Sequence, residues 1–159
     1  MQYGTHYVDY NGCELIAIYN ALFQLGDRRS LSNIIYTARN TKGVSWGPGA
    51  LFGSHPEKIG DLLDVFGHSY VSTKNRNEFN DMLESGKTYI ISFWTGKTGM
   101  STIHTVMFNM ISEEEIEVYN YTNGSKRTRN FKAKDGRSAL DIMLDENGRE
   151  IMLYKVNEK

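Results

Sequence analysis

The sequence predicts an α+β protein whose first half is helical and whose second half forms a mostly antiparallel sheet. Apolar residues recur at helical spacing up to about residue 84, and short β-rich segments follow from Thr88 onward. At 159 residues, of which 40% are hydrophobic, the chain is long enough for one domain with its own core. We therefore expect a single two-lobed domain over residues 1–159.

The segment 11–25 predicts a buried helix that carries the only cysteine, Cys13. Asn11 is a favourable N-cap residue, and Glu14 stands three residues later, the position from which a capping box is closed. Apolar side chains lie nearly all round the helix, which places it inside the fold. Gly26 then provides a left-handed stop. The preceding residues 1–10 are expected to be extended.

Three further helices are expected before the sheet, each with its own start signal and apolar spacing. They are Leu31–Ala38 capped by Ser30, a helix from Pro56 to about Phe66, and a helix from Asn75 or Asn77 to Glu84. The glycine-rich segment Asn40–Ser54 predicts a long loop around Trp46. Its apolar residues either cover the core or form a wall of a substrate cleft, and the pattern does not decide between these.

The second half predicts a series of short strands separated by turns rich in glycine or acidic residues. The expected strands are His68–Ser72, Thr88–Trp94, Ile103–Met110, Glu115–Tyr121, Lys126–Ala133 and Glu150–Asn157. One helix, from Asp135 or Ser138 to Asp145, interrupts the series. Because only a short polar turn joins Ile103–Met110 to Glu115–Tyr121, these two strands are expected to pair as an antiparallel hairpin.

Composition excludes several classes of function. The net charge is −1, from 18 basic and 19 acidic residues, so no general attraction to nucleic acid is expected. No apolar run approaches the length of a membrane span, so no membrane insertion is expected. The histidines are scattered and there is no second cysteine, which predicts neither a metal site nor a disulfide. Without a phosphate-binding glycine motif, no cofactor is expected.

The N-terminus has no charged segment followed by an apolar stretch, as a signal peptide would. This predicts a cytoplasmic protein, although a secreted protein whose signal peptide had been removed would have the same sequence. The composition says nothing about oligomeric state.

Cys13 stands where a helix favours nucleophilic chemistry. The positive end of the helix dipole and the unpaired N–H groups of the first turn both favour a thiolate. The same N–H groups are suited to receive the oxyanion of a carbonyl under attack. The alternative is an inert buried cysteine, which is the common role of a lone intracellular one.

A nucleophilic cysteine needs a base, and the base needs an orienting group. His104 opens an apolar strand and shares a face with Val106 and Phe108, whereas Asn120 is the polar residue on one face of the next strand. In an antiparallel hairpin Asn120 lies opposite His104 or within about three residues of it. An Asn120 side-chain carbonyl beside one ring nitrogen would leave the other facing the sulfur. Alternatively, His104 is a satisfied core histidine and Asn120 a turn residue.

This order of residues resembles the papain-like cysteine peptidases, and most of all their double-glycine, bacteriocin-processing branch. In that branch a cysteine tripeptide starts the central helix, a Gly-Lys-Pro-type strand follows a helix, and His-Phe-Val-Val precedes an Asp or Asn. The resemblance covers about residues 11–157. The matching stretches are Asn11-Gly12-Cys13, Gly86-Lys87-Thr88-Tyr89-Ile90-Ile91, His104-Thr105-Val106-Met107-Phe108 and Val118-Tyr119-Asn120-Tyr121, with 16 residues between His104 and Asn120.

The resemblance implies a papain-like fold and a bacterial thiol protease that processes a peptide or protein substrate. Cys13 would attack the amide to form a thioester, His104 would transfer the proton, and Asn120 would orient the imidazole. The same three residues also suit an acyltransferase or a deamidase. A non-catalytic binding domain on the same scaffold is the third interpretation.

One position departs from the family pattern. The family has a glutamine six residues before the cysteine to complete the oxyanion hole, and this chain has Tyr7 there. The candidates for the missing donor or for the cleft wall are therefore Tyr7, Asn11, Gln2 and Trp46.

Overall fold

The computed structural model describes residues 1–3, 6–7, 12–45, 54–95, 102–122, 127–146 and 149–158. Within these ranges the chain is α+β, and its main sheet is antiparallel with the strand order β3-β8-β4-β5-β6-β7. A short antiparallel pair precedes it, β1 (Gln2–Tyr3) with β2 (His6–Tyr7). None of the described helices combines the length and apolar character that crossing a membrane requires.

The main sheet is built from strands whose burial follows their place in it. Central β4 is buried on both faces, β6 alternates between buried and half-buried residues, and edge strand β7 buries one residue. Their bounds are β3 (Tyr70–Thr73), β4 (Thr88–Trp94), β5 (Ile103–Ser112), β6 (Glu115–Tyr119), β7 (Arg129–Lys132) and β8 (Glu150–Val156).

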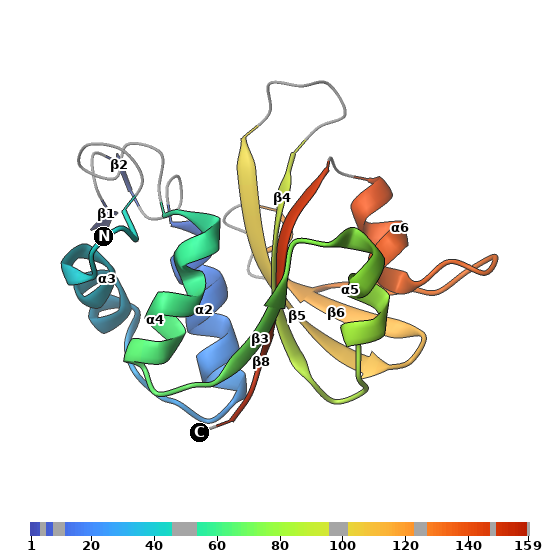
Figure 1. The fold of residues 1–159 in the computed structure, drawn as a ribbon, viewed down its shortest axis with the longest axis horizontal. Helices are drawn as coiled ribbons and strands as arrows, with labels where there is room; N and C mark the ends of the chain where they lie inside the picture. Colours follow the sequence, from blue (N-terminus) through green and yellow to red (C-terminus); the bar gives the residue numbers. More distant parts are fainter. Residues whose placement is uncertain are drawn as a thin grey trace.

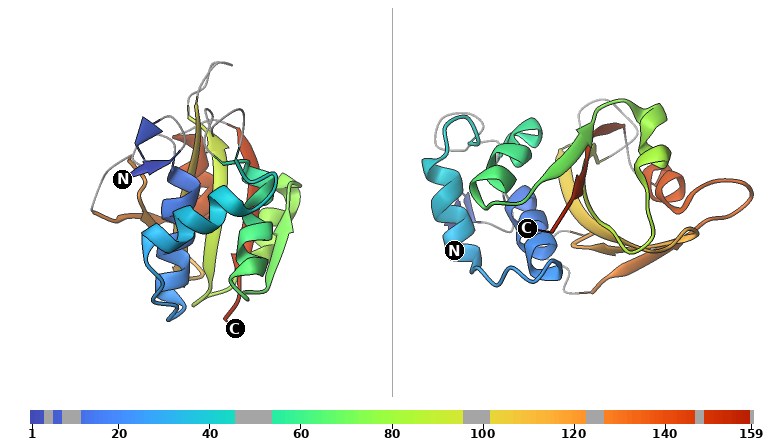
Figure 2. Two further views of the ribbon diagram at one scale, coloured as in Figure 1. Left: turned by 90° about the vertical axis from the view of Figure 1, so that its left-hand side faces the viewer. Right: turned by 60° about the horizontal axis from the view of Figure 1, so that its bottom comes forward.

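Helices cover both faces of the sheet (Figures 1 and 2). One face packs against α2, with α3 and α4 on the same side, and the other carries α5 and α6. The helices are α2 (Cys13–Gln24), α3 (Leu31–Asn40), α4 (Ile59–Val65), α5 (Arg76–Met82) and α6 (Ala139–Asp145), and the 3₁₀ turn η2 (Pro56–Lys58) leads into α4.

The alternation of side chains along the strands divides the core into two parts. Ile90 of β4 and Met107 of β5 join Leu15 and Ile18 of α2 on one face. Residues of the opposite parity, such as Phe108, pack on the other face with α5 and α6. The sheet therefore separates an α2-side core from an α6-side core, and α2 lies against its centre.

The start of α2 differs from the prediction. Its N-cap is Gly12, no side chain caps it, and Glu14 is buried, so the capping box expected from Asn11 and Glu14 is wrong. Asn11 itself lies outside the described residues. The predicted stop is confirmed, because Gly26 has a φ of 82°.

Most other predicted elements appear with small changes at their ends. Ser30 caps α3 and Ser138 caps α6, the latter through a complete capping box with Asp141. The expected helix from Pro56 begins as a 3₁₀ turn. Strand β6 ends at Tyr119, two residues earlier than predicted, because Asn120 takes a left-handed φ of 56° that cannot continue a strand.

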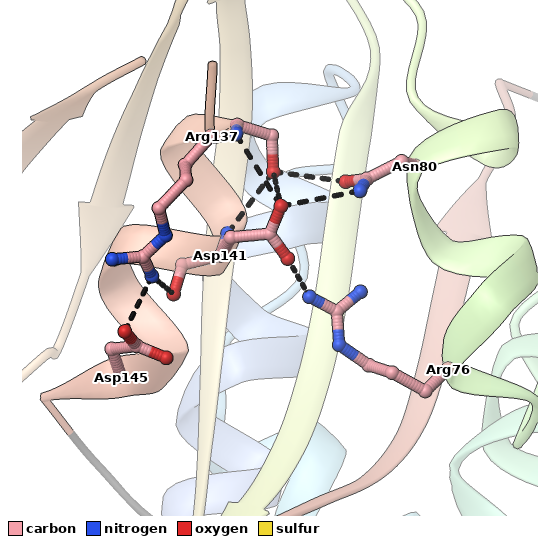
Figure 3. Close-up of polar contacts among 6 residues, drawn as sticks. Arg76, Asn80, Arg137, Asp141 and Asp145 are labelled. Atoms are coloured by element: carbon pink, nitrogen blue, oxygen red, sulfur yellow. Dashed lines mark hydrogen bonds and ion pairs between the residues drawn. The ribbon is translucent and has the colours of Figure 1, made fainter. Parts of the chain in front are cut away.

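A polar network fixes α5 against α6 on the outer side of the sheet (Figure 3). Asp141 accepts hydrogen bonds from Arg76 and from Asn80, the latter at 3.3 Å. Arg137 forms an ion pair with Asp145 at 2.5 Å. Because these groups are partly exposed, we assign them a supporting role in stability and not a chemical one.

Gly60 of α4 makes a close contact that only glycine permits. A Cβ there would overlap the ring of Tyr70 on β3, which packs edge-on against Tyr154. We expect Gly60→Ala to lower the free energy of unfolding by about 1–3 kcal/mol. Urea denaturation measures this loss. Adding Tyr70→Ala to Gly60→Ala should relieve part of the packing strain, because it removes the ring that the new Cβ overlaps. Unchanged stability in the single variant would contradict the close approach.

Candidate active site

The candidate site lies where the N-terminus of α2 meets the beginning of β5. Cys13 is the first residue of α2, and its side chain is nearly buried, with 6% exposed. The main-chain N–H of Thr105, the residue after His104, stabilises the charged form of the sulfur. Helix packing thus brings the thiol to the strand that carries His104.

The surroundings of Cys13 favour a neutral thiol. Burial raises the pKa of the Cys13 thiol well above its ordinary value, and the neighbouring Glu14 carboxylate raises it further. The N–H groups of Thr105 and Glu14 act in the opposite direction without cancelling the rise in pKa. A thiol in this state attacks a carbonyl only if a base removes its proton during the attack.

Glu14 is the group that contacts the thiol directly. The Cys13 Sγ–H donates to Glu14 Oε2 at 3.3 Å, and the Glu14 side chain has only 3% of its surface exposed. Burial raises the pKa of Glu14 to about 7, although hydrogen bonds from its own N–H, from Cys13 and from the Ser54 N–H lower it. The expectation that Glu14 closes a capping box is therefore wrong.

A buried hydroxyl cluster continues from Glu14 through Ser54. Tyr3, which is fully buried, places its hydroxyl 3.0 Å from Ser54 Oγ and 3.2 Å from Ser45 Oγ. Ser45 and Ser54 also form an isolated antiparallel bridge. Strand β1 is thereby connected to the carboxylate beside the thiol.

His104 is buried at the beginning of β5, with 7% exposed. Its Nε2 lies 2.8 Å from the main-chain oxygen of Asn120, and its ring packs edge-on against Phe93 at 5.8 Å. Because a carbonyl oxygen only accepts, Nε2 carries the proton, and the neutral ring has its lone pair on Nδ1. Burial lowers the pKa of His104, and the main-chain carbonyls of Asn120 and Tyr121 partly oppose this.

Asn120 contacts the imidazole through a different atom from the one expected. The predicted contact used the side-chain amide, whereas the structure uses the main-chain carbonyl. The last residue pair of the hairpin is Met107 with Tyr119, so Asn120 follows immediately, within the predicted register. Its Nδ2 is buried without a hydrogen-bond partner in the described part of the chain.

The thiol and the imidazole reach the same end of β5 from its two sides. Helix α2 packs on the face that includes Met107, whereas His104 contacts Phe93 on the opposite face. Among the described residues no hydrogen bond joins Cys13 to His104; the thiol bonds to Glu14 and the imidazole to Asn120.

The predicted oxyanion and cleft residues are only partly described. Gln2 is exposed and pairs with Tyr7 across the β1–β2 ladder, and its main-chain oxygen accepts a 2.6 Å hydrogen bond from Arg39. The side chain of Tyr7, and Asn11 and Trp46 altogether, lie outside the described residues. Of the side chains proposed for the oxyanion hole or cleft, Gln2 is thus the one that can be placed.

A cavity of about 470 Å³ lies between η2 and the strands β4, β5 and β8. It combines apolar walls with charged groups of both signs, among them a 2.6 Å ion pair between Lys74 and Glu57. Two of its residues are chain neighbours of the site, Ile103 beside His104 and His55 beside Ser54. The lining residues are His55, Pro56, Glu57, Lys74, Trp94, Ile103, Arg149, Glu150 and Ile151.

Two of the remaining histidines have structural contacts that the sequence did not indicate. His68 is buried and bonds Asp27 at 3.2 Å and the main-chain oxygen of Asn157 at 3.0 Å. His55 caps η2 by accepting from the Glu57 N–H. In the ranges that the structure describes, no group of three His, Cys, Asp or Glu side chains is placed to hold a metal ion.

The raised pKa of Glu14 makes a prediction about stability. The Glu14 carboxyl titrates near 7 in the folded protein and near 4.5 in the unfolded chain. The folded protein therefore loses stability as the pH rises from 4.5 to 7. The difference corresponds to about 3 kcal/mol at about 1.4 kcal/mol per pH unit. We expect Glu14→Gln to gain about that much stability relative to the wild type between pH 4.5 and pH 8. Urea unfolding across this range measures the gain, and a difference that does not vary with pH would contradict it.

No protein-family model matches the sequence, and no curated protein matches it either.

Proposed function

We propose that this protein is a papain-like cysteine hydrolase that cleaves an amide bond in a peptide or protein. The observation that carries the proposal is the placement of His104. Its Nε2 is fixed by Asn120, and the N–H of the next residue, Thr105, stabilises the sulfur of Cys13 at the start of a helix. The proposal assigns Cys13 as the nucleophile, His104 as the base and the Asn120 carbonyl as the group that orients the base.

In the proposed reaction Cys13 is the nucleophile and His104 carries the proton at each step. Cys13 attacks the carbonyl carbon as His104 Nδ1 takes the thiol proton, and the carbonyl electron pair moves to oxygen. His104 then returns the proton to the departing amine, which leaves an acyl thioester on Cys13. Water, deprotonated by the same imidazole, attacks the thioester carbonyl; the C–S bond then breaks, the acid product leaves, and the imidazole returns the proton to the Cys13 sulfur.

The oxyanion would be held by the first N–H groups of α2, beginning with that of Cys13. Those groups have no partner within the helix, because the first turn of any helix lacks acceptors for them. A second donor would come from the side chains named above, Tyr7, Asn11 or Gln2. The cavity beside Ile103 would receive part of the substrate, with Trp94 as an apolar contact.

A non-catalytic binding domain is the second candidate, and a specific observation favours it. The thiol donates its hydrogen bond to Glu14, and its raised pKa keeps it protonated. A scaffold that retained the fold but used the cavity only for binding would tolerate such a thiol.

One experiment distinguishes the proposals. The protein is incubated with a complex peptide mixture, and new peptide termini are identified by mass spectrometry, with ammonia measured in parallel. We expect new termini with the wild type and none with Cys13→Ser. Ammonia release without cleavage would indicate a deamidase. The absence of both products, together with retained peptides on the protein, would favour the binding domain.

A further inference from the structure

Glu14 is a buried ionisable side chain that the proposed reaction does not use, and it contacts the nucleophile. Glu14 stands on an otherwise apolar part of α2, between Cys13 and the fully buried Leu15. A carboxylate in such surroundings is unfavourable unless donors surround it. Here the donors are the Ser54 N–H, its own N–H and the Cys13 thiol.

These contacts fix the direction of the thiol proton. The Sγ–H points to Glu14 Oε2 at 3.3 Å, whereas the Thr105 N–H lowers the pKa of the thiol. His104 accepts no hydrogen bond from Cys13 in the portion of the chain that is described, and its Nε2 is occupied by Asn120. The proton is thus held on the carboxylate side of the sulfur.

We propose that Glu14 is a positioning residue for Cys13: its ionised carboxylate holds the thiol proton away from His104, and protonating that carboxylate releases the thiol. The inference builds on the proposed function, because it assigns what governs the availability of the nucleophile. It involves the movement of one proton and no covalent step.

The titratable groups around Glu14 allow the effect to be separated from other ionisations. Within the described residues these are Cys13 beside it, Tyr3 beyond Ser54, and His104 next to Thr105 on β5. Burial raises the pKa of Glu14 to about 7 and lowers the pKa of His104, and the His104→Ala variant separates the two ionisations.

Coupling between Glu14 and Cys13 predicts a characteristic pH profile. Below pH 7, with Glu14 protonated, the thiolate population rises tenfold per pH unit. Above pH 7 one of the two groups, Glu14 or Cys13, is already ionised, and the other carries the remaining proton. The ratio of thiolate to carboxylate then stops depending on pH until the second proton leaves. The rate of thiol alkylation should therefore level off near pH 7.

The test measures the rate of iodoacetamide alkylation of the full chain from pH 5 to pH 10. Since Cys13 is the only cysteine, the added mass reports it alone. We expect a break near pH 7 in the wild type and in His104→Ala. In Glu14→Gln the break should vanish, and the rate at pH 8.5 should be higher by about tenfold or more. The matched control Asp64→Asn, which removes an exposed carboxylate from α4, should retain the break.

A wild-type profile that rises without a break through pH 7 would overturn the proposal, and this readout does not depend on whether Glu14→Gln folds. A break that persists in Glu14→Gln, or that vanishes in His104→Ala instead, would also overturn it. Alkylation requires no turnover, so these results are independent of the peptide-cleavage experiment. A break without peptide cleavage would contradict the hydrolase and leave the role of Glu14 intact.

Discussion

Replacing Cys13 with alanine is expected to abolish hydrolysis and to change thermal stability little. The sulfur is the only atom in the proposed site that forms a bond to the substrate, so no residual acyl transfer is expected. The removed group is small and touches the polar Glu14, so we expect destabilisation of about 1 kcal/mol.

Peptide cleavage and the thermal unfolding midpoint measure the two effects on one preparation. Cys13→Ser is the matched control, since it keeps a donor for Glu14 while removing the sulfur. A large loss of stability in Cys13→Ala, with activity retained in proportion to the folded fraction, would show that Cys13 is a core residue and not a nucleophile.

Replacing His104 with alanine is expected to lower turnover by about 10²–10⁴-fold, the usual contribution of a general acid–base residue. Asn120→Ala should lower it by less than about tenfold, because the imidazole bonds the main-chain carbonyl, which alanine retains. Alanine is nevertheless strained at the left-handed φ of 56° and should cost about 1 kcal/mol of stability.

Asn120→Gly separates these two effects, since glycine accepts the left-handed conformation and also keeps the carbonyl. We expect Asn120→Gly to match or exceed Asn120→Ala in turnover. Steady-state kinetics on purified variants measures both. Equal losses in His104→Ala and in both Asn120 variants would mean that the Asn120 amide itself is needed, in conflict with the observed contact.

The main features of the fold could be predicted from local patterns. Strand β4 has the bounds expected of it. A short apolar run between Gly86 and a glycine-rich segment of the sequence is typical of a buried strand. The caps Ser30 and Ser138 are recognisable because a cap acts within three residues. The end of β6 could not be predicted in this way, because the local pattern does not indicate that Asn120 takes a left-handed φ of 56°.

The site was harder to predict, because its contacts join residues distant in sequence. The sequence placed Cys13 at a helix start and His104 at a strand start, and the structure has both there. It did not predict that Glu14 turns inward, since this depends on Ser54, forty residues away. The contact of Asn120 through its main chain was equally hidden, because a pattern of side chains carries no information about which carbonyl faces a ring.

The most direct test of the proposed hydrolase is the fate of an acyl group on Cys13. The wild type and His104→Ala are acetylated with p-nitrophenyl acetate, freed of reagent, and followed by intact-mass spectrometry. We predict an acetyl group on Cys13 that is lost rapidly from the wild type and persists in His104→Ala, because the imidazole must activate water. An acetyl group lost at the same rate from both proteins, or no acetylation of Cys13, would contradict the catalytic pairing of Cys13 with His104.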